Sequence, residues 1–320
     1  MMAHMRPTGT SALSGIGDTP VFPLTRVVSP GHAEVWVKLE AGNPTGSYKD
    51  RMALSMIAGA ERRGDLKPGM TVVEFTGGST GSSLAFVCAV KGYRLHVVSS
   101  DAFAKEKLDT MRAFGADLEI VASDGGRITP DLFVRMRERT LALAAQPNTF
   151  WTNQFNNSDA LLGYESIGVE LLEQLGDSMT AYCGAVGTAG MLMGVGRALR
   201  RVLPAIRIVA FEPDGSPVLT TGRAGSHRVE GIGTGAVPPK FDRASVSDIR
   251  VVSESDARAL ARRLAAEEGV FGGTSSAINV LGALTLAREL GPDQRVVTVV
   301  VDSGLKYLAG DLYATPPRAH

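Results

Sequence analysis

The 320-residue sequence contains only two cysteines and has no excess of either charge. Cys88 and Cys183 lie in apolar stretches, which predicts buried thiols and offers neither a disulfide framework nor a metal-binding spacing. The five histidines include no His-x-x-x-His pair, which argues against a zinc or iron site. Lys plus Arg and Asp plus Glu balance at 33 each, so no net field favours nucleic acid or a membrane surface as a partner.

Long apolar runs are also missing, and none reaches the roughly 20 residues that a membrane-spanning helix needs. The first residues contain no apolar segment typical of a secretory signal, so the sequence predicts a cytoplasmic protein. With 44% hydrophobic and 21% charged residues, the chain can bury a large core and is not disordered.

Short runs rich in Val, Ile and Leu alternate with longer segments of helical spacing, a pattern typical of parallel sheets covered by helices. We predict strands over residues 35–39, 71–75, 95–99, 118–121, 180–183, 207–211, 249–252 and 296–301. We predict helices over residues 48–63, 79–91, 104–114, 130–145, 159–175, 189–202, 255–268, 275–290 and 304–311. The periodicity breaks near residues 146–157, where Pro and Asn gather. The expected fold is α/β in two lobes: a smaller domain over 35–150, and a larger one over 151–320 that also includes about 12–34.

A lysine follows a turn of Gly, Asn, Pro and Ser in GNPTGSYKDRMA, where Lys49 stands at the start of a predicted helix. A lone lysine is ordinarily a solvated surface residue, and this stretch alone does not exclude that interpretation.

Two strands of the predicted sheets run directly into glycine-rich loops and then into helices. The first loop contains Thr76, Gly77, Gly78, Ser79 and Thr80. Its glycines, hydroxyls and helix N-terminus favour a bound anion, and it lacks the lysine of a P-loop. The loop could bind a carboxylate, but a glycine turn that only lets the strand and the helix pack together would have the same sequence.

The second loop contains Gly187, Thr188, Ala189, Gly190 and Met191, and its backbone N–H groups are placed to cradle a phosphate. Glu212 ends the next strand, about 20 residues further along the chain, which is the spacing of the acid that binds the ribose in dinucleotide-binding folds. A nicotinamide-dependent oxidoreductase therefore remains an alternative. The G-x-x-G-x-x-G spacing nevertheless differs from the dinucleotide fingerprint. Near the end, Ser303 follows an apolar strand and suits either a ligand contact or a helix N-cap.

Together, these stretches resemble one family along nearly the whole chain. The lysine turn, the hydroxyl-rich loop, the phosphate-type loop and the late Asp-Ser-Gly look like those of fold type II pyridoxal-phosphate enzymes. The resemblance is to cysteine synthase (O-acetylserine sulfhydrylase) and the catalytic core of cystathionine β-synthase. It implies a fold similar to the tryptophan synthase β subunit, pyridoxal 5'-phosphate as cofactor, a small amino-acid substrate and a homodimer.

The resemblance also implies roles for individual residues. Lys49 would be the Schiff-base lysine, with its amine pKa lowered by a dry pocket. Thr76, Gly77, Gly78, Ser79 and Thr80 would form the substrate loop, in which Ser79 also reaches the cofactor. Gly187, Thr188, Ala189, Gly190 and Met191 would hold the phosphate, and Ser303 would face the pyridine nitrogen. Gln154 would lie near the substrate carboxylate, and Gly231 would line the reacting face.

Three stretches differ from the family pattern. The substrate loop usually reads Thr-Ser-Gly-Asn-Thr-Gly, so Gly77 replaces a serine and Ser79 an asparagine. In the phosphate loop, Ala189 replaces a glycine and Met191 a threonine. The usual Ser-Ser-Gly reads Ser275-Ser276-Ala277.

The implied reaction is β-replacement on an activated serine through an aminoacrylate, in which O-acetylserine and sulfide give cysteine and acetate. A β-elimination lyase, such as a cysteine desulfhydrase or a serine/threonine dehydratase, remains an alternative that uses Lys49 alike. A third interpretation is that the chain is a non-catalytic relative, which binds the cofactor without turnover.

Overall fold

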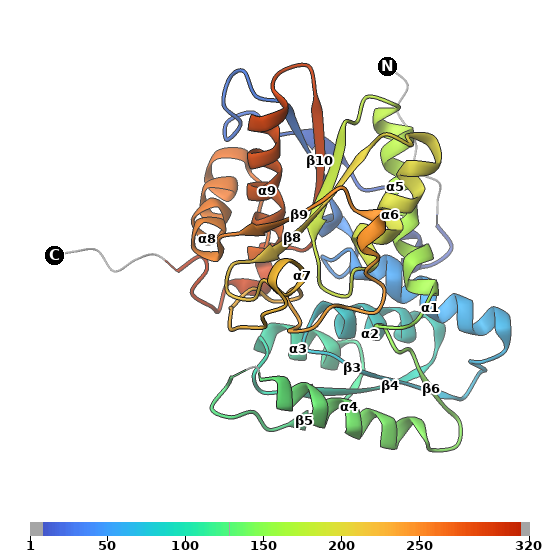
Figure 1. Ribbon diagram of the computed structural model, residues 1–320. Coiled ribbons are helices and arrows are strands. Elements are labelled where there is room, and N and C mark those ends of the chain that lie inside the picture. Colours follow the sequence, from blue (N-terminus) through green and yellow to red (C-terminus); the bar gives the residue numbers. More distant parts are fainter. Residues whose placement is uncertain (1–8, 128, 315–320) are drawn as a thin grey trace.

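Residues 9–127 and 129–314, which the computed structural model describes, form two sheets with helices packed on both faces of each (Figure 1). The strands are β1 (Val21–Pro23), β2 (Glu34–Leu39), β3 (Thr71–Phe75), β4 (Arg94–Ser100), β5 (Asp117–Val121), β6 (Thr149–Trp151), β7 (Ala181–Ala185), β8 (Arg207–Pro213), β9 (Asp248–Val252) and β10 (Arg295–Val300). The α-helices are α1 (Lys49–Arg63), α2 (Ser79–Lys91), α3 (Lys105–Ala113), α4 (Pro130–Ala144), α5 (Asp159–Leu175), α6 (Gly190–Val202), α7 (Val218–Thr221), α8 (Glu254–Arg263) and α9 (Thr274–Leu290).

The larger lobe is built on a six-stranded sheet with the order β1-β2-β10-β7-β8-β9. Only β1 runs antiparallel to its neighbour, and the other pairs are parallel. Helices α8 and α9 pack on one face, with α9 contacting β10 and β7, while α5 and α6 form a pair on the other. The inner strands are buried on both faces, which explains why β10 reads as the apolar run RVVTVV.

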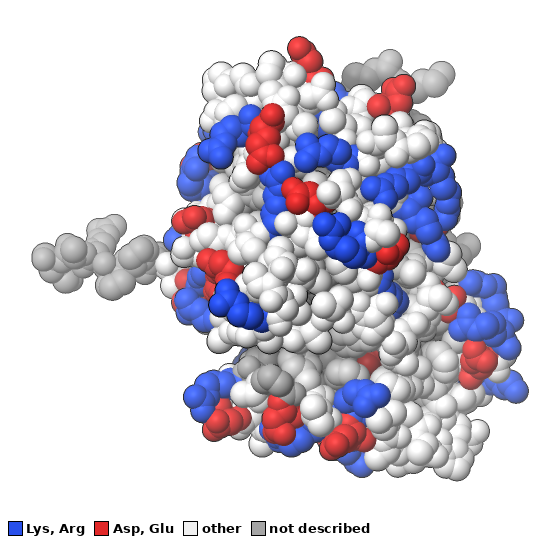
Figure 2. Space-filling view, viewed as in Figure 1, with Lys and Arg blue, Asp and Glu red and all other residues white. Residues whose placement is uncertain are grey.

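The smaller lobe is built on a four-stranded parallel sheet with the order β5-β4-β3-β6. Helix α4 covers one face, and α2 and α3 pack against the other. Helix α1 contacts both α2 and α5, so it lies where the two lobes meet. On the face seen in Figure 2, charged side chains of both signs cover both lobes, and the surface along their boundary is largely uncharged.

The predicted elements agree with the structure over most of the chain, with two differences. The predicted boundary at residue 35 places the strand at 35–39 in the smaller domain, whereas β2 pairs with β10 in the larger sheet. The predicted helix over 304–311 is a single 3-10 turn, Gly304–Tyr307. The short elements β1, β6 and α7 carry too few residues to show a period and were not predicted.

None of the helices in the described part of the chain is long and apolar enough to cross a membrane. In the same residues, no cluster of His, Cys, Asp and Glu could hold a metal ion.

Candidate active site

The turn before Lys49 packs against the carboxyl end of β10. The Tyr48 N–H donates to the Val301 carbonyl (3.0 Å), and the Ser303 N–H donates to the Gly46 carbonyl (3.0 Å). Asp50, in the first turn of α1, accepts the N–H of Thr45 at 2.8 Å and so holds the turn in place. The structure therefore brings together two segments that lie more than 250 residues apart, at the edge where parallel sheets bind ligands.

The amine of Lys49 is buried without a carboxylate partner among the residues that the structure describes. The residue is 7% exposed, and its Nζ lies 4.6 Å from the ring centroid of Tyr48 and 5.7 Å from that of Tyr164. Burial disfavours the ammonium form and lowers the pKa of Lys49 to about 8. The burial agrees with the expected pocket, and a lowered pKa favours the neutral amine that a nucleophile needs.

The first glycine loop joins β3 to α2 and contacts Gln154. The Thr80 hydroxyl donates to Gln154 Oε1 (2.8 Å), and Gln154 Nε2 donates to the Phe75 carbonyl (3.3 Å). Within the loop, the Gly78 N–H donates to the Thr76 hydroxyl at 3.1 Å. The structure thus brings Gln154, predicted from a different part of the sequence, to the loop at the N-terminus of α2.

Gly77 differs from the family pattern for a reason visible in its surroundings. A Cβ at this position would lie 2.1 Å from Cε1 of Phe103, so the ring fills the space that a side chain would need. Phe103 was not among the predicted site residues, because nothing in the sequence links it to Gly77.

The second glycine loop joins β7 to α6. No backbone carbonyl or side chain in residues 9–127 and 129–314 accepts a hydrogen bond from the N–H groups of residues 187–191. These donors stand at the N-terminus of a helix, the arrangement that binds phosphate. A Cβ on Gly187 would lie 2.1 Å from the Gly231 carbonyl, which requires glycine there and places Gly231 against the loop.

Ala189 and Met191 occupy positions where the family has glycine and threonine. Ala189 has φ +64°, the left-handed conformation that an alanine adopts only under strain. Met191 is 5% exposed, and its Cε would lie 2.8 Å from a Cβ on Gly184, so it packs under the loop.

Ser303 has the geometry of a helix cap. Its hydroxyl accepts the Leu305 N–H at 3.3 Å. Asp302, next to it, accepts the Gly273 N–H (3.2 Å) and the Tyr307 hydroxyl. A second hydroxyl belongs to Thr274, which begins α9 close to the bridge between Gly272 and Ser303 and is 4% exposed. From the sequence, only Ser303 was predicted to face the pyridine nitrogen.

Three further lysines join the lobes around this site. Lys107, at 3% exposure, pairs with Glu230, and Lys306 Nζ donates to the Ser79 hydroxyl at 3.2 Å. Lys240 Nζ donates to the Gln154 carbonyl at 2.5 Å. All three were missed in the sequence, because single lysines on loops and helices normally indicate solvated surface.

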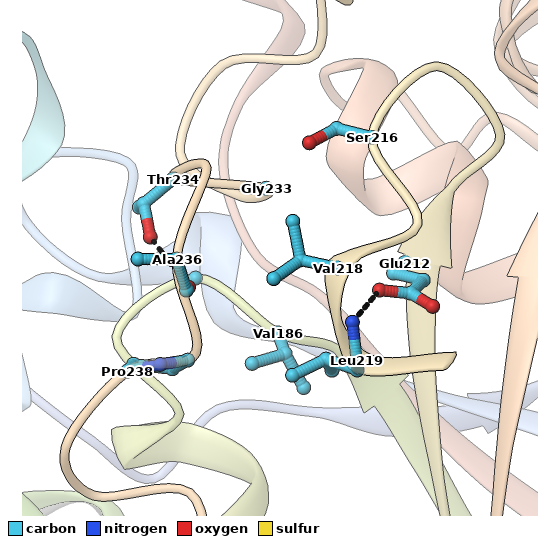
Figure 3. A pocket seen from close by; sticks show the side chains of 10 residues that line it. Val186, Glu212, Ser216, Val218, Leu219, Gly233, Thr234, Ala236 and Pro238 are labelled. Carbon is cyan, nitrogen blue, oxygen red and sulfur yellow. Dashed lines mark hydrogen bonds between the residues drawn. The ribbon is translucent and has the colours of Figure 1, made fainter. Parts of the chain in front are cut away.

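A small pocket lies beside the second loop, between the segment of Gly233, Thr234, Ala236 and Pro238 and the residues Glu212, Val218 and Leu219 (Figure 3). Both oxygens of Glu212 are engaged locally: they accept the N–H groups of Leu219 (2.6 Å) and Thr220 (2.9 Å). Glu212 thus caps α7, and this use of the carboxylate removes the main support for the nicotinamide alternative.

Comparisons with known proteins agree with this geometry. Residues 12–302 match the family described as pyridoxal-phosphate dependent enzyme. A cysteine synthase of Staphylococcus aureus (strain Mu50) is 40% identical over 301 residues, 93% of this chain and 95% of the relative. An O-ureido-L-serine synthase of Streptomyces lavendulae is 36% identical, covering 96% of this chain and 93% of the relative. The crystal structure of a cysteine synthase from Entamoeba histolytica superposes with a TM-score of 0.90 at 30% identity, over 100% of this chain and 95% of the other.

The buried lysine, the two glycine loops at helix N-termini and these similarities lead to one assignment. The chain belongs to the pyridoxal-phosphate dependent enzymes of fold type II.

Proposed function

We propose that this protein is a cysteine synthase that performs β-replacement on O-acetyl-L-serine. The Cβ–O bond breaks with its electron pair leaving on acetate, and the electron pair of sulfide forms the new Cβ–S bond of cysteine. The observation that carries the proposal is the buried Lys49 amine, which has no carboxylate partner in the described residues and lies against Tyr164, whose ring in turn packs against Gly190 of the second loop.

The residues present fit the cofactor. The amine of Lys49 would hold its aldehyde carbon, and the free N–H groups of residues 187–191 would hold its phosphate. Ser303 would face its ring nitrogen, with Thr274 as a second candidate because the Ser303 hydroxyl already caps a helix turn. When bound, pyridoxal phosphate supplies an electron sink for a carbanion at the substrate Cα.

The remaining steps belong to residues of this chain. Thr76, Gly78 and Thr80, with Gln154 behind them, would bind the substrate carboxylate at the N-terminus of α2. Lys49, whose buried position disfavours the ammonium form, would take the proton from Cα as a neutral amine and return it after sulfide has added.

The test is to follow the visible absorption of the purified protein loaded with pyridoxal phosphate while O-acetyl-L-serine and then sulfide are added. We expect a yellow protein whose band changes with O-acetyl-L-serine and returns with sulfide, together with cysteine and acetate in equal amounts. Pyruvate and ammonia in place of cysteine would assign a lyase. A protein that remains colourless with pyridoxal phosphate would contradict the role of Lys49.

Ser79 provides a second test. The family asparagine at this position reaches the cofactor, whereas Ser79 accepts a hydrogen bond from Lys306. We expect Ser79→Asn to raise the rate with O-acetyl-L-serine and sulfide. An unchanged or lower rate would point to a different activated serine as the native substrate.

We also propose that the enzyme is a cytoplasmic homodimer. Cys88 and Cys183 are buried free thiols, which suits a reducing compartment.

Leu162 and Val169, 48% and 46% exposed on one face of α5, are candidates for a subunit contact. Light scattering on Leu162→Ser and Val169→Ser variants tests this contact, and an unchanged dimer would exclude this face.

A further inference from the structure

Lys240 is a half-buried cation anchored next to the substrate subsite. Its Nζ donates to the backbone carbonyl of Gln154 at 2.5 Å, and the side chain of Gln154 bonds Thr80 of the substrate loop. The backbone on either side is fixed, because the Phe241 N–H donates to the Pro238 carbonyl (2.9 Å) and the Phe241 ring packs against the core. The amine is therefore held in place rather than free to reach into solvent.

The charge of Lys240 is not matched by a direct partner. It forms no salt bridge with any carboxylate in the residues that the structure describes. Its pKa is lowered to about 8, mainly by burial and also by the nearby charge of Lys49, while Glu74 partly opposes both. Glu74 is fully buried and already accepts the Thr152 hydroxyl (2.6 Å) and the Gln154 N–H (2.9 Å).

The other two lysines of the site have acidic neighbours. Lys107 pairs directly with Glu230. Lys306 is close enough to Asp302, Asp50 and Glu230 for their charges to raise its pKa against the effect of burial. The charges that shift the pKa of Lys240 are instead those of Lys49, a cation, and of Glu74, whose carboxylate oxygens already accept hydrogen bonds from other groups. A cation held in this way, with spare N–H donors and no counter-charge, is suited to an anionic ligand group.

We propose that Lys240 is a specificity-determining residue that binds a second negative group on a substrate, in addition to the α-carboxylate held by the Thr76–Thr80 loop. This inference rests on the proposed β-replacement and specifies its substrate class. The negative group has the chemistry of a phosphate or carboxylate. It belongs either to the leaving group of the activated serine or to the thiol nucleophile.

The experiment compares the wild-type holoenzyme with Lys240→Met, Lys240→Arg and, as a matched loss of charge at an exposed position, Lys67→Met. The donor arm measures kcat/KM with sulfide for O-phospho-L-serine and for O-acetyl-L-serine. The nucleophile arm uses O-acetyl-L-serine with mercaptoacetate or with the uncharged 2-mercaptoethanol. A binding measurement by titration calorimetry uses inorganic phosphate, because the phosphate loop of the holoenzyme is already filled by the cofactor.

Loss of a hydrogen bond to a charged group corresponds to about 10- to 100-fold in affinity. We therefore expect Lys240→Met to lower kcat/KM by this factor for the charged partner in one arm, and by less than about threefold for its uncharged counterpart. The arm that responds identifies the source of the negative group. Lys240→Arg should retain most of the effect, Lys67→Met should behave as wild type, and Lys240→Met should bind phosphate more weakly.

An equal decrease for charged and uncharged partners would mean that Lys240 only supports Gln154, and it would overturn the proposal. No decrease in either arm would overturn it as well. If the wild type converts none of these pairs and O-acetyl-L-serine leaves its spectrum unchanged, the proposed function fails instead. The phosphate titration then still decides whether Lys240 binds an anion.

Discussion

Lys38 and Lys49 are both buried lysines, but their neighbours differ. Lys38 is fully buried on β2, and its Nζ donates to the Thr19 carbonyl (2.7 Å) and to Gln174 (2.8 Å) and pairs with Glu170 (2.7 Å). Lys49 has tyrosine rings around its amine and no carboxylate among the described residues. The comparison teaches that burial alone does not make a lysine reactive. Burial lowers the pKa of both amines, but Glu170 offsets part of this effect at Lys38, whereas no carboxylate in the described residues pairs with Lys49.

The Lys38 region is a network rather than a single pair. Arg51 donates to Glu40 (2.7 Å) and is also paired with Glu170, so the buried Lys38, Arg51 and Glu40 form one network with the partly buried Glu170. Each of these charges faces an opposite charge, so removing one member leaves a buried charge without its partner, which is strongly destabilising. Arg51 lies on α1, two residues after Lys49, so this network also anchors the helix that presents the reactive amine.

The largest effect should come from replacing Lys49. We expect Lys49→Ala to lower turnover of O-acetyl-L-serine by about 10³-fold or more, because both the cofactor anchor and the general base are lost. The cofactor-free variant should still unfold cooperatively in urea, because no ion pair is broken and loss of the buried amine also removes the cost of burying its charge. Activity close to wild type would refute the assignment of Lys49.

Replacing Lys38 should have the opposite effect, because it should lower stability rather than turnover. Lys38→Met should lower the free energy of unfolding by about 3 kcal/mol, the low end for a broken buried pair, because Arg51 still faces Glu170. Lys91→Met, which breaks the half-exposed pair of Lys91 with Glu61, is the matched control and should cost less than about 1 kcal/mol. Equal losses in the two variants would show that the buried network contributes no more than a surface pair.

The two regions should also respond to opposite ends of the pH range. In the cofactor-free protein, the pKa of Lys49 is lowered from 10.5 to about 8, so the unfolded chain binds more protons between these values and stability rises with pH there. Urea unfolding at pH 8 and 10.5 should show a gain of about 3 kcal/mol in wild type relative to Lys49→Met. A difference between the two proteins that does not change with pH would contradict the lowered pKa.

For Glu170 the direction is reversed. Burial opposes its ionisation, but Arg51 and Lys38 outweigh that effect and lower the pKa of Glu170 from 4.5 to about 2. Its contribution to stability is therefore complete above pH 4.5 and is lost as the pH falls toward 2. The ion pairs around Lys38 should therefore lose their contribution to the free energy of unfolding in acid, where the Lys49 amine remains fully protonated.

Much of this fold could be predicted from the sequence, because its strands and helices are long enough to show their periods. Helix α5 and strand β3 have the predicted bounds, 159–175 and 71–75. The pairing of β2 with β10 could not be predicted, because the pairing of distant strands depends on the tertiary fold and leaves no local pattern.

The candidate site shows the same limit. The glycine loops and Lys49 could be found because each combines a distinctive composition with a strand-to-helix position. Phe103, Lys107 and Lys240 could not, because their roles depend on contacts with Gly77, Glu230 and Gln154, which lie 26 to 123 residues away in the chain. Lys38 also looks like an ordinary strand lysine until its partner Glu170 on α5 is placed beside it.

The smallest effect should come from Ala189, where the phosphate loop holds an alanine at φ +64°. Ala189→Gly should raise the free energy of unfolding by about 1 kcal/mol, because relief of the left-handed strain exceeds the added entropy of the unfolded chain. Ala142→Gly, in the exposed interior of α4, is the control and should instead lower it by about 1 kcal/mol. Urea unfolding of both variants without cofactor gives the answer. If Ala189→Gly is destabilising as well, the loop is not strained, and its alanine stabilises the phosphate site by restricting the unfolded chain.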